Sequence, residues 1–262
     1  MKGIYFSGTG NSKYCLEIFM NLMDSKSTAE TCISIEDPEL KEKILSEEEL
    51  VFSYPVQYSN VPKILTDFIK DHSALWNGKR IFIIATMGLF SGDGAGCLGR
   101  LLGKYGAAIT GGLHLRMPDS ICDEKVLKHT TEEEQEIIKA AEQKIMNAVS
   151  QIKAGEFPQD GIGICSHLAG LFGQRLYFYS KTKKYTDRIR INENTCTGCG
   201  ACVKQCPMQN LSVSKEGIAQ AGAMCTMCYR CVNLCKTQSI TLLGTKVIHQ
   251  RVPLEFHGLE EQ

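Results

Sequence analysis

The sequence predicts an α/β fold in which a doubly wound, five-stranded parallel sheet is followed by a small α+β domain. Short apolar runs alternate with helix-like segments from residue 2 to residue 155, which is typical of repeated β–α units. The run KRIFIIATM at residues 79–87 is nearly continuous in its apolar character, as central parallel strands are. Eight of the 13 cysteines are crowded between Cys196 and Cys235, which indicates a separate unit there.

Five strands and four helices are predicted before the cysteine-rich part. The strands are apolar runs at residues 2–6, 30–35, 50–56, 79–87 and 108–118. The helices are expected at residues 13–24, 61–72, 94–106 and 130–155. The buried face of the last helix is predicted from its apolar stripe, which consists of Ile138, Ala141, Ile145, Val149 and Ile152. In such a sheet, ligands bind at the carboxyl ends of the strands.

Composition excludes several classes of function. Lys and Arg total 29 and Asp and Glu total 29, so net charge gives no case for binding nucleic acid or an anionic membrane. The opening MKGIYFSGTGNS lacks the apolar stretch of a signal peptide, and no run of about 18 apolar residues predicts a membrane span. We therefore expect a cytoplasmic protein without a transmembrane segment, whose cysteines are thiolate ligands rather than disulfides.

Two cysteine runs carry the strongest chemical signal. Each reads C-x2-C-x2-C-x3-C, and the second repeats the first at an offset of 225 − 196 = 29 residues. In this pattern three thiolates hold one iron–sulfur cluster, and the fourth cysteine ligates the other cluster. The sequence therefore predicts two [4Fe–4S] clusters, one held by Cys196, Cys199, Cys202 and Cys235, the other by Cys225, Cys228, Cys231 and Cys206.

Structural zinc is the alternative interpretation of these cysteines, but zinc sites use two cysteine pairs separated by a spacer rather than triplets. Pro207 follows the first run, as expected for a proline that starts a helix, whereas Lys236 takes the matching place after the second. A cation at this place is expected to affect the potential of the cluster that Cys235 ligates.

A phosphate site is predicted after the first strand. The loop SGTGNS at residues 7–12 joins that strand to a helix, so its N–H groups meet the positive end of the helix dipole. It contains no lysine, which excludes a Walker P-loop, and the GxGxxG pattern is absent. A simple glycine turn is the alternative interpretation.

Two further loops follow the predicted strands at residues 50–56 and 79–87. Together with the first loop, they make the chain resemble a known family. SGTGNS resembles the phosphate loop of flavodoxins, and SYPVQYSNVP and ATMGLFSGDG resemble the two loops that grip the flavin ring. MPDS at residues 117–120 is similar to a segment of clostridial-type flavodoxin–ferredoxin fusion proteins. The resemblance covers almost the whole chain, apart from Lys236 and residues 159–187. It implies a flavodoxin-like sheet of order 2-1-3-4-5 and a ferredoxin-like 2[4Fe–4S] domain.

The resemblance also implies FMN, held by the three loops. The expected cofactor-binding residues are Ser7, Thr9, Gly10, Asn11, Ser12, Tyr54, Pro55, Val56, Gln57, Tyr58, Asn60, Thr86, Met87, Gly88, Phe90 and Gly92. Tyr58 and Phe90 are candidates for stacking on the flavin ring, with core or rim packing as the alternative. Asp93 is expected to disfavour the anionic reduced flavin if it lies nearby, or otherwise to be a solvated turn residue.

The expected organisation is an FMN domain at 1–156, a linker at 157–187, a ferredoxin domain at 188–247 and a tail at 248–262. We expect an electron-transfer protein that relays electrons between the clusters and FMN, with a redox protein or a small molecule as its donor or acceptor. One alternative is an FMN-dependent reductase of a small organic substrate, with Tyr58 or His114 as proton donor. Another is a regulatory iron–sulfur module without flavin.

Overall fold

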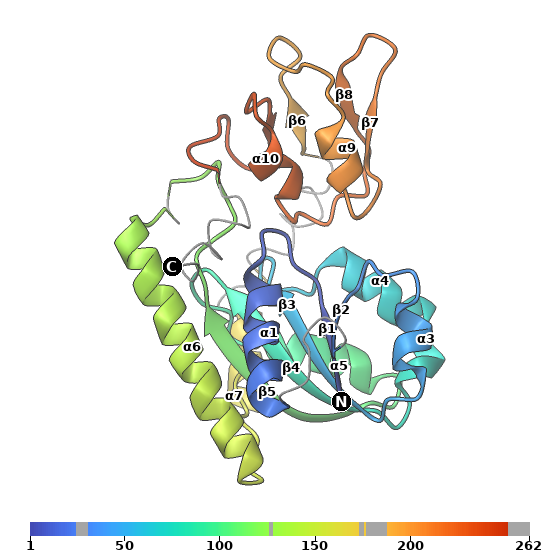
Figure 1. Ribbon diagram of the computed structural model, residues 1–262, viewed down its shortest axis with the longest axis vertical. Helices are drawn as coiled ribbons and strands as arrows, with labels where there is room; N and C mark the ends of the chain where they lie inside the picture. The colour runs from blue at the N-terminus through green and yellow to red at the C-terminus, as the bar shows by residue number, and fades with distance from the viewer. Residues whose placement is uncertain (25–30, 126–127, 173–175, 177–187, 251–262) are drawn as a thin grey trace. The chain divides into compact units, whose positions relative to one another are not determined.

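The computed structural model describes residues 1–24, 31–125, 128–172, 176 and 188–250, and the chain divides into two compact units (Figure 1). The first unit consists of Met1–Ser7, Asn11–Pro118 and Thr130–Phe178, and the second of Gly8–Gly10, Asp119–His129 and Tyr179–Gln262. This division differs from the boundaries expected from the sequence, since Asp119–His129 groups with the second unit and residues after 156 group with the first.

The first unit contains the predicted parallel sheet. Its strand order is β2-β1-β3-β4-β5, and every neighbouring pair is parallel, which confirms the predicted topology. The strands are β1 (Lys2–Tyr5), β2 (Cys32–Ser34), β3 (Glu49–Pro55), β4 (Arg80–Met87) and β5 (Ala108–Arg116). The interiors of β3 and β4 are buried continuously, because helices cover both faces of the sheet.

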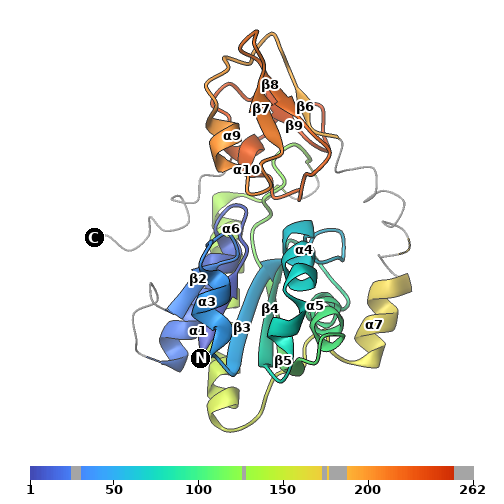
Figure 2. The same cartoon turned by 90° about the vertical axis from the view of Figure 1, so that its right-hand side faces the viewer.

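The helices lie in two layers around the sheet (Figure 2). One layer is formed by α1 (Asn11–Met23) and α6 (Thr131–Lys153), and the other includes α4 (Lys63–Asp71) and α5 (Gly94–Gly103). Two short elements, α3 (Leu40–Leu45) and the 3₁₀ helix η1 (Ser73–Trp76), were not expected from the sequence. The core between the sheet and the first layer includes Phe19 and Phe82, whose rings stack with centroids 5.4 Å apart.

Helix α6 has well-defined ends. Its N-cap Thr130 accepts a hydrogen bond from Glu133 N, and the Glu133 carboxylate accepts one from Thr130 N, forming a capping box. From the predicted stripe, Ala141, Ile145 and Val149 are buried. Gly155 follows the helix with a φ of 89°, a conformation that glycine adopts without strain.

Residues 157–170 also belong to the first unit. Gly112 N donates to Pro158 O at 2.8 Å and Asp160 N donates to Gly112 O at 2.9 Å, so this segment adds a parallel bridge beside β5. A Cβ at Gly112 would lie 2.6 Å from Asp160 O, so only glycine permits this approach. Helix α7 (Ile164–Gly170) follows and contacts α5.

The second unit is the predicted small α+β fold, and its described residues form two short antiparallel ribbons and two short helices. One ribbon pairs β6 (Arg190–Ile191) with β9 (Ile240–Thr241), and the other pairs β7 (Leu211–Val213) with β8 (Ala219–Ala221). The helices are α9 (Ala201–Gln205) and α10 (Arg230–Leu234). The second helix begins 230 − 201 = 29 residues after the first, so the fold repeats at the sequence offset.

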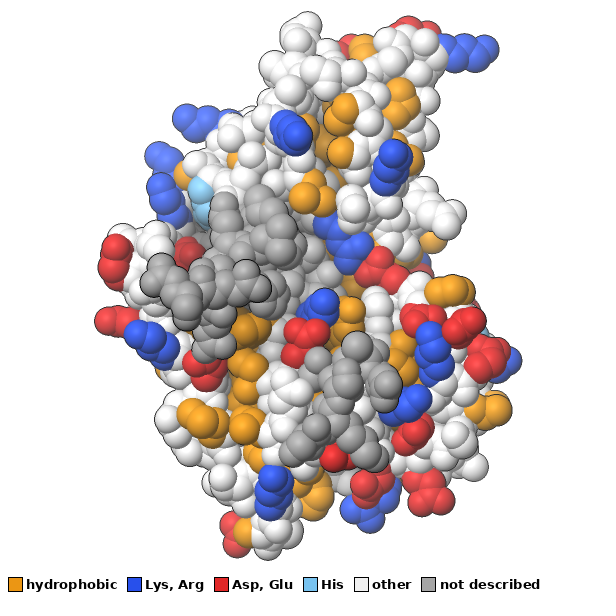
Figure 3. Space-filling view, viewed as in Figure 1, with side chains coloured by type: hydrophobic (Ala, Val, Ile, Leu, Met, Phe, Trp, Pro, Cys, Tyr) orange, Lys and Arg blue, Asp and Glu red, His pale blue; other side chains and the backbone are white. Residues whose placement is uncertain are grey.

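No helix among the described residues is long and apolar enough to cross a membrane. On the face shown in Figure 3, the acidic and basic side chains of the first unit are interspersed. This mixture agrees with the balanced charge of the sequence.

Candidate functional site

The three predicted flavin loops follow β1, β3 and β4, and Thr86 links them. Its hydroxyl lies 2.7 Å from the hydroxyl of Ser12, and its carbonyl oxygen accepts a hydrogen bond from Val56 N at 2.8 Å. Both hydroxyl side chains are buried. Ser12 O also accepts a 2.7 Å hydrogen bond from Ser53 Oγ. The carboxyl edge of the sheet therefore carries a connected set of loops, where ligands bind in this class of fold.

Two polar atoms of these loops suit a polar ligand. Gly10 has a φ of 106°, which turns the first loop into α1, and Asn11 then donates through its amide to Pro118 O at 2.6 Å. Asn11 Oδ1 and Ser91 Oγ are buried without a hydrogen-bond partner among the described residues. Because unpartnered buried polar atoms are costly, they are groups that a hydroxylated, phosphorylated ligand such as FMN would satisfy.

The aromatic residues of the loops occupy different positions. Tyr58 and Ser59 have φ values of 49° and 59° in a tight turn closed by the pairing of Gln57 with Asn60. Phe90 is 62 % exposed. Tyr54 is fully buried and its hydroxyl donates to Gly94 O at 2.5 Å. Its side chain therefore braces the second and third loops against each other.

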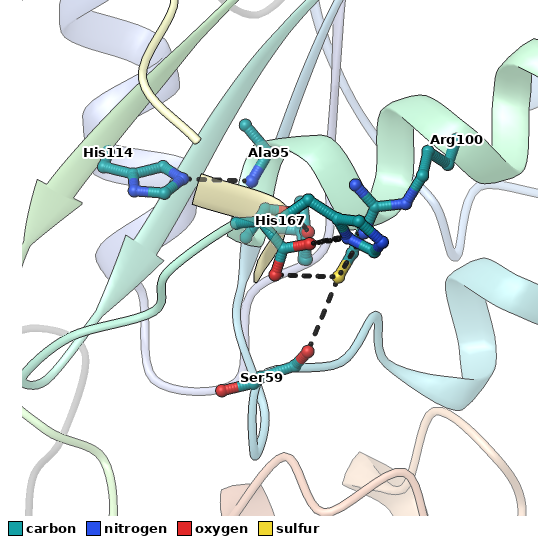
Figure 4. Close-up of polar contacts among 9 residues, drawn as sticks. Ser59, Ala95, Arg100, His114 and His167 are labelled. Carbon is teal, nitrogen blue, oxygen red and sulfur yellow. Dashed lines mark hydrogen bonds and ion pairs between the residues drawn. The ribbon is translucent and has the colours of Figure 1, made fainter. Parts of the chain in front are cut away.

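Around Asp93, the structure shows a polar network that sequence reasoning missed (Figure 4). The Asp93 side chain is fully inaccessible, and Oδ2 accepts hydrogen bonds from Arg100 Nη2 at 2.5 Å and from His167 Nδ1 at 3.0 Å. The Cys97 thiol lies 3.6 Å from Oδ1 and 3.5 Å from Ser59 O. Asp93 is thus neither solvated nor without a charge partner; it ties the third loop to α5 and α7.

His114 lies on β5, where its ring nitrogen Nε2 accepts a 3.1 Å hydrogen bond from Ala95 N at the start of α5 (Figure 4). Nε2 is therefore engaged with the backbone, which leaves the expected proton donation without support. Burial lowers the pKa of His114, Asp160 and Asp93 act to raise it, and Lys144 acts to lower it further.

This lowered pKa predicts a pH dependence of folding stability. An unfolded histidine takes up a proton below about pH 6.5, whereas folded His114 resists protonation, so stability is full above that pH and falls with the pH below it. Glutamine can accept the Ala95 hydrogen bond without titrating, so His114→Gln is expected to reduce the loss of stability between pH 7 and 5. Urea unfolding at several pH values measures this difference.

His114→Leu is the matched control, because it removes both the titration and the acceptor. It is expected to be less stable than His114→Gln by about 1–3 kcal/mol at every pH, since the Ala95 N–H is left unpaired. If the free energy of unfolding depended on pH in both variants as it does in the wild type, the role assigned to His114 would be contradicted.

The two cysteine runs have matching backbone conformations. The first has left-handed residues at Gly198 and Gly200, and the second at Met227 and Tyr229, each 29 positions later. In both runs, the fourth cysteine accepts a 3.3 Å hydrogen bond from a backbone N–H four residues on: Cys206 Sγ from Asn210 N, and Cys235 Sγ from Ser239 N. The repeated spacing therefore specifies a repeated loop-and-helix structure with N–H groups aimed at sulfur.

The structure brings thiols of the two runs together. One cavity is lined by thiols from both runs, namely Cys206, Cys225, Cys228 and Cys231. Elsewhere, the pKa of Cys202 is raised by its burial and by the charges of Cys235 and Cys196, which places these three thiols near one another. Among the described residues, no group of three or more His, Cys, Asp or Glu side chains is arranged to hold a single metal ion.

Ionised thiols are unfavourable in this cavity when no metal is bound to them. Burial raises the pKa of Cys225 to about 12 and that of Cys231 well above its ordinary value, and the charges of neighbouring thiols raise both further. Metal coordination deprotonates such thiols and compensates the buried charge. These four residues therefore fit an iron–sulfur cluster.

Comparison with known proteins supports this interpretation of the second unit. Residues 188–236 match the family model of the 4Fe-4S dicluster domain, and this range contains all eight cysteines of the two runs. A "Probable ferredoxin" of Methanosarcina thermophila is 47 % identical over 30 residues, which are 12 % of this chain and 52 % of that protein. The match thus spans about half the length of this relative.

Solved structures with similar folds include flavodoxins. The two-electron reduced flavodoxin of Megasphaera elsdenii is 19 % identical, with 54 % of this chain and 98 % of that chain covered and a TM-score of 0.39. A flavodoxin of Fusobacterium nucleatum bound to flavin mononucleotide is 16 % identical, with 59 % and 97 % covered and a TM-score of 0.40. Likeness this distant says nothing about the ligand of this chain.

The fold class instead follows from the strand order, which is that of flavodoxins. The chain therefore joins a flavodoxin-like fold to a 4Fe-4S dicluster domain, in the order predicted from the sequence.

Proposed function

We propose that this protein relays single electrons between two [4Fe–4S] clusters and an FMN, and so couples one-electron to two-electron redox chemistry. The observation that carries the proposal is the cavity where Cys206 of the first run joins Cys225, Cys228 and Cys231 of the second. This exchange of one cysteine between runs is the arrangement of two-cluster electron carriers. The clusters supply one-electron chemistry when bound.

The flavin part of the proposal is supported by the loops at the carboxyl edge of the sheet. The loop at 7–12 provides N–H groups at the start of α1 for a phosphate, and Asn11 Oδ1 and Ser91 Oγ provide buried polar atoms. Phe90 provides an exposed ring. FMN, when bound, would accept one or two electrons. We propose a cytoplasmic location and a redox protein or small redox molecule as partner.

Anaerobic purification followed by stepwise photoreduction tests this function. We expect about eight iron atoms and one FMN per chain, with EPR signals of reduced clusters and flavin absorbance that bleaches in one-electron steps. Absence of flavin would favour a regulatory iron–sulfur module. Flavin reduced only in two-electron steps would favour the reductase alternative and would overturn the relay.

Lys236 provides a prediction about the cluster of Cys196, Cys199, Cys202 and Cys235. The pKa of Cys199 is lowered, mainly by a hydrogen bond from the backbone of Ala201, and the Lys236 cation contributes to the lowering. A nearby cation favours the more negative, reduced cluster. Lys236→Gln is therefore expected to lower the potential of this cluster by on the order of tens of millivolts, less at high salt.

A redox titration followed by EPR measures this shift. The matched control is Lys41→Gln on α3, which removes an exposed lysine of the first unit. A shift in potential confined to the other cluster, or equal shifts in both variants, would contradict the expected effect of Lys236 on this cluster.

A further inference from the structure

Tyr229 occupies a backbone conformation that its side chain disfavours. Its φ is 60°, at the position where the first run has Gly200 with a φ of 74°. Residues with a Cβ rarely adopt this left-handed conformation, whereas glycine does so freely. The second run therefore needs a contact, absent from the equivalent place in the first run, that holds its loop in the same shape.

Asp123 provides this contact from a distant part of the sequence. Its side chain is 3 % exposed, and Oδ1 accepts a 2.9 Å hydrogen bond from the hydroxyl of Tyr229, which is itself buried. Oδ2 accepts hydrogen bonds from Leu242 N at 2.7 Å and Leu243 N at 3.0 Å. All three partners donate, so the carboxyl group acts only as an acceptor, which is the pattern of an ionised carboxylate.

The segment that carries Asp123 is fixed on both sides. The carbonyl oxygen of Ser120 accepts a 3.0 Å hydrogen bond from Asn233 Nδ2, and that of Cys122 accepts one from Ile248 N at 2.8 Å. The Cys122 side chain is fully buried in the apolar core of the second unit. Asp123 is therefore held in place by contacts other than that with the Tyr229 hydroxyl, and it can act as an anchor for this side chain.

The partners of Asp123 line one cluster cavity. Tyr229 and Leu242 both border the cavity formed by Cys206, Cys225, Cys228 and Cys231. Tyr229 also directly follows Cys228 in the chain. A negative charge bonded to this wall opposes the addition of an electron to the cluster inside it, which lowers its reduction potential.

We propose that Asp123 is a positioning residue for the cluster held by Cys206, Cys225, Cys228 and Cys231. It holds Tyr229 in its left-handed conformation and sets the potential of this cluster selectively. The proposal rests on the two-cluster assignment of the proposed function.

The test is a redox titration of the full-length, anaerobically purified protein, with each cluster followed by EPR. Asp123→Asn is expected to raise the potential of one cluster and to leave that of the other unchanged. The affected signal should be the one that Cys206→Ala removes. Tyr229→Phe removes the hydroxyl but leaves the carboxylate charge in place with one donor fewer, so it is not expected to raise the potential of this cluster.

The matched control is Asp119→Asn, on the same segment, whose carboxylate accepts a 2.8 Å hydrogen bond from Ile121 N. It is expected to cause no selective shift. If Asp123→Asn shifts neither cluster, or shifts both equally, the proposal is overturned. Wild-type protein without two clusters would instead overturn the proposed function, so the two failures are distinguishable.

A second variant covers the case in which Asp123→Asn loses the cluster altogether. Tyr229→Gly gives the second run the same residue as Gly200 in the first, so the loop no longer needs its anchor. Because Tyr229 is buried and its removal opens a cavity, Tyr229→Gly alone is the reference, and adding Asp123→Asn to it is expected to cause no further loss of iron or of the EPR signal. A further loss in the double variant would show that Asp123 does not act by positioning Tyr229.

Discussion

Replacing Cys206 with alanine is expected to remove the cluster whose other three ligands lie in the second run. Cys206 belongs to the first run in sequence, but it lines the cavity of Cys225, Cys228 and Cys231. Its loss should therefore lower the iron content to about half and abolish one EPR signal while the other remains. Iron analysis and EPR of the dithionite-reduced protein measure both effects.

Cys235→Ala is the reciprocal variant and is expected to remove the other signal. Cys165→Ala is the control, because this exposed cysteine lies outside both runs and should leave iron unchanged. If Cys206→Ala and Cys235→Ala removed the same signal, the exchange of ligands between the runs would be refuted.

Substitution of Asp93 by alanine is expected to destabilise the first unit. The carboxylate is inaccessible, and its removal leaves Arg100 and His167 without their common acceptor. Because Arg100 is 39 % exposed, water compensates part of this loss, and we expect destabilisation by about 2 kcal/mol. The measurement is urea unfolding followed by far-UV circular dichroism.

Loss of Asp93 should also weaken the retention of FMN, since Asp93 ties the third loop to α5 and α7. Asp93→Asn keeps the size and one acceptor oxygen, so it is expected to lose less stability and less flavin than the alanine variant. Equal unfolding free energies for wild type and Asp93→Ala would contradict the bracing role of the network.

Much of the fold could be predicted because its signals are local. Each of the five strands is an apolar run, and α6 carries a regular stripe, so their places follow from periodicity. The assignment of cysteines to two clusters is a prediction from a spacing that is specific to two-cluster proteins, and the variants Cys206→Ala and Cys235→Ala test it. The short helices α3 and α7 were missed because six or seven residues are too few to establish a helical period.

The missed parts of the site depend on contacts between residues far apart in the chain. His167 meets Asp93 across 74 positions, and Tyr229 meets Asp123 across 106. A single aspartate in a polar stretch has no local pattern that identifies its partner. The same limit explains Tyr54 and His114, whose side chains turned out to be engaged by backbone atoms of α5.

The discontinuous second unit has a consequence for biosynthesis. The segment with Cys122 and Asp123 leaves the ribosome before α6, but its partners Tyr229, Leu242 and Ile248 are made much later. Domains generally fold as units, N-terminal ones first. The first unit can therefore fold early, while the segment with Cys122 and Asp123 still lacks its hydrogen-bond partners. Iron–sulfur loading is then expected only after almost the whole chain has been translated, and nascent chains that stop before residue 248 should not complete it.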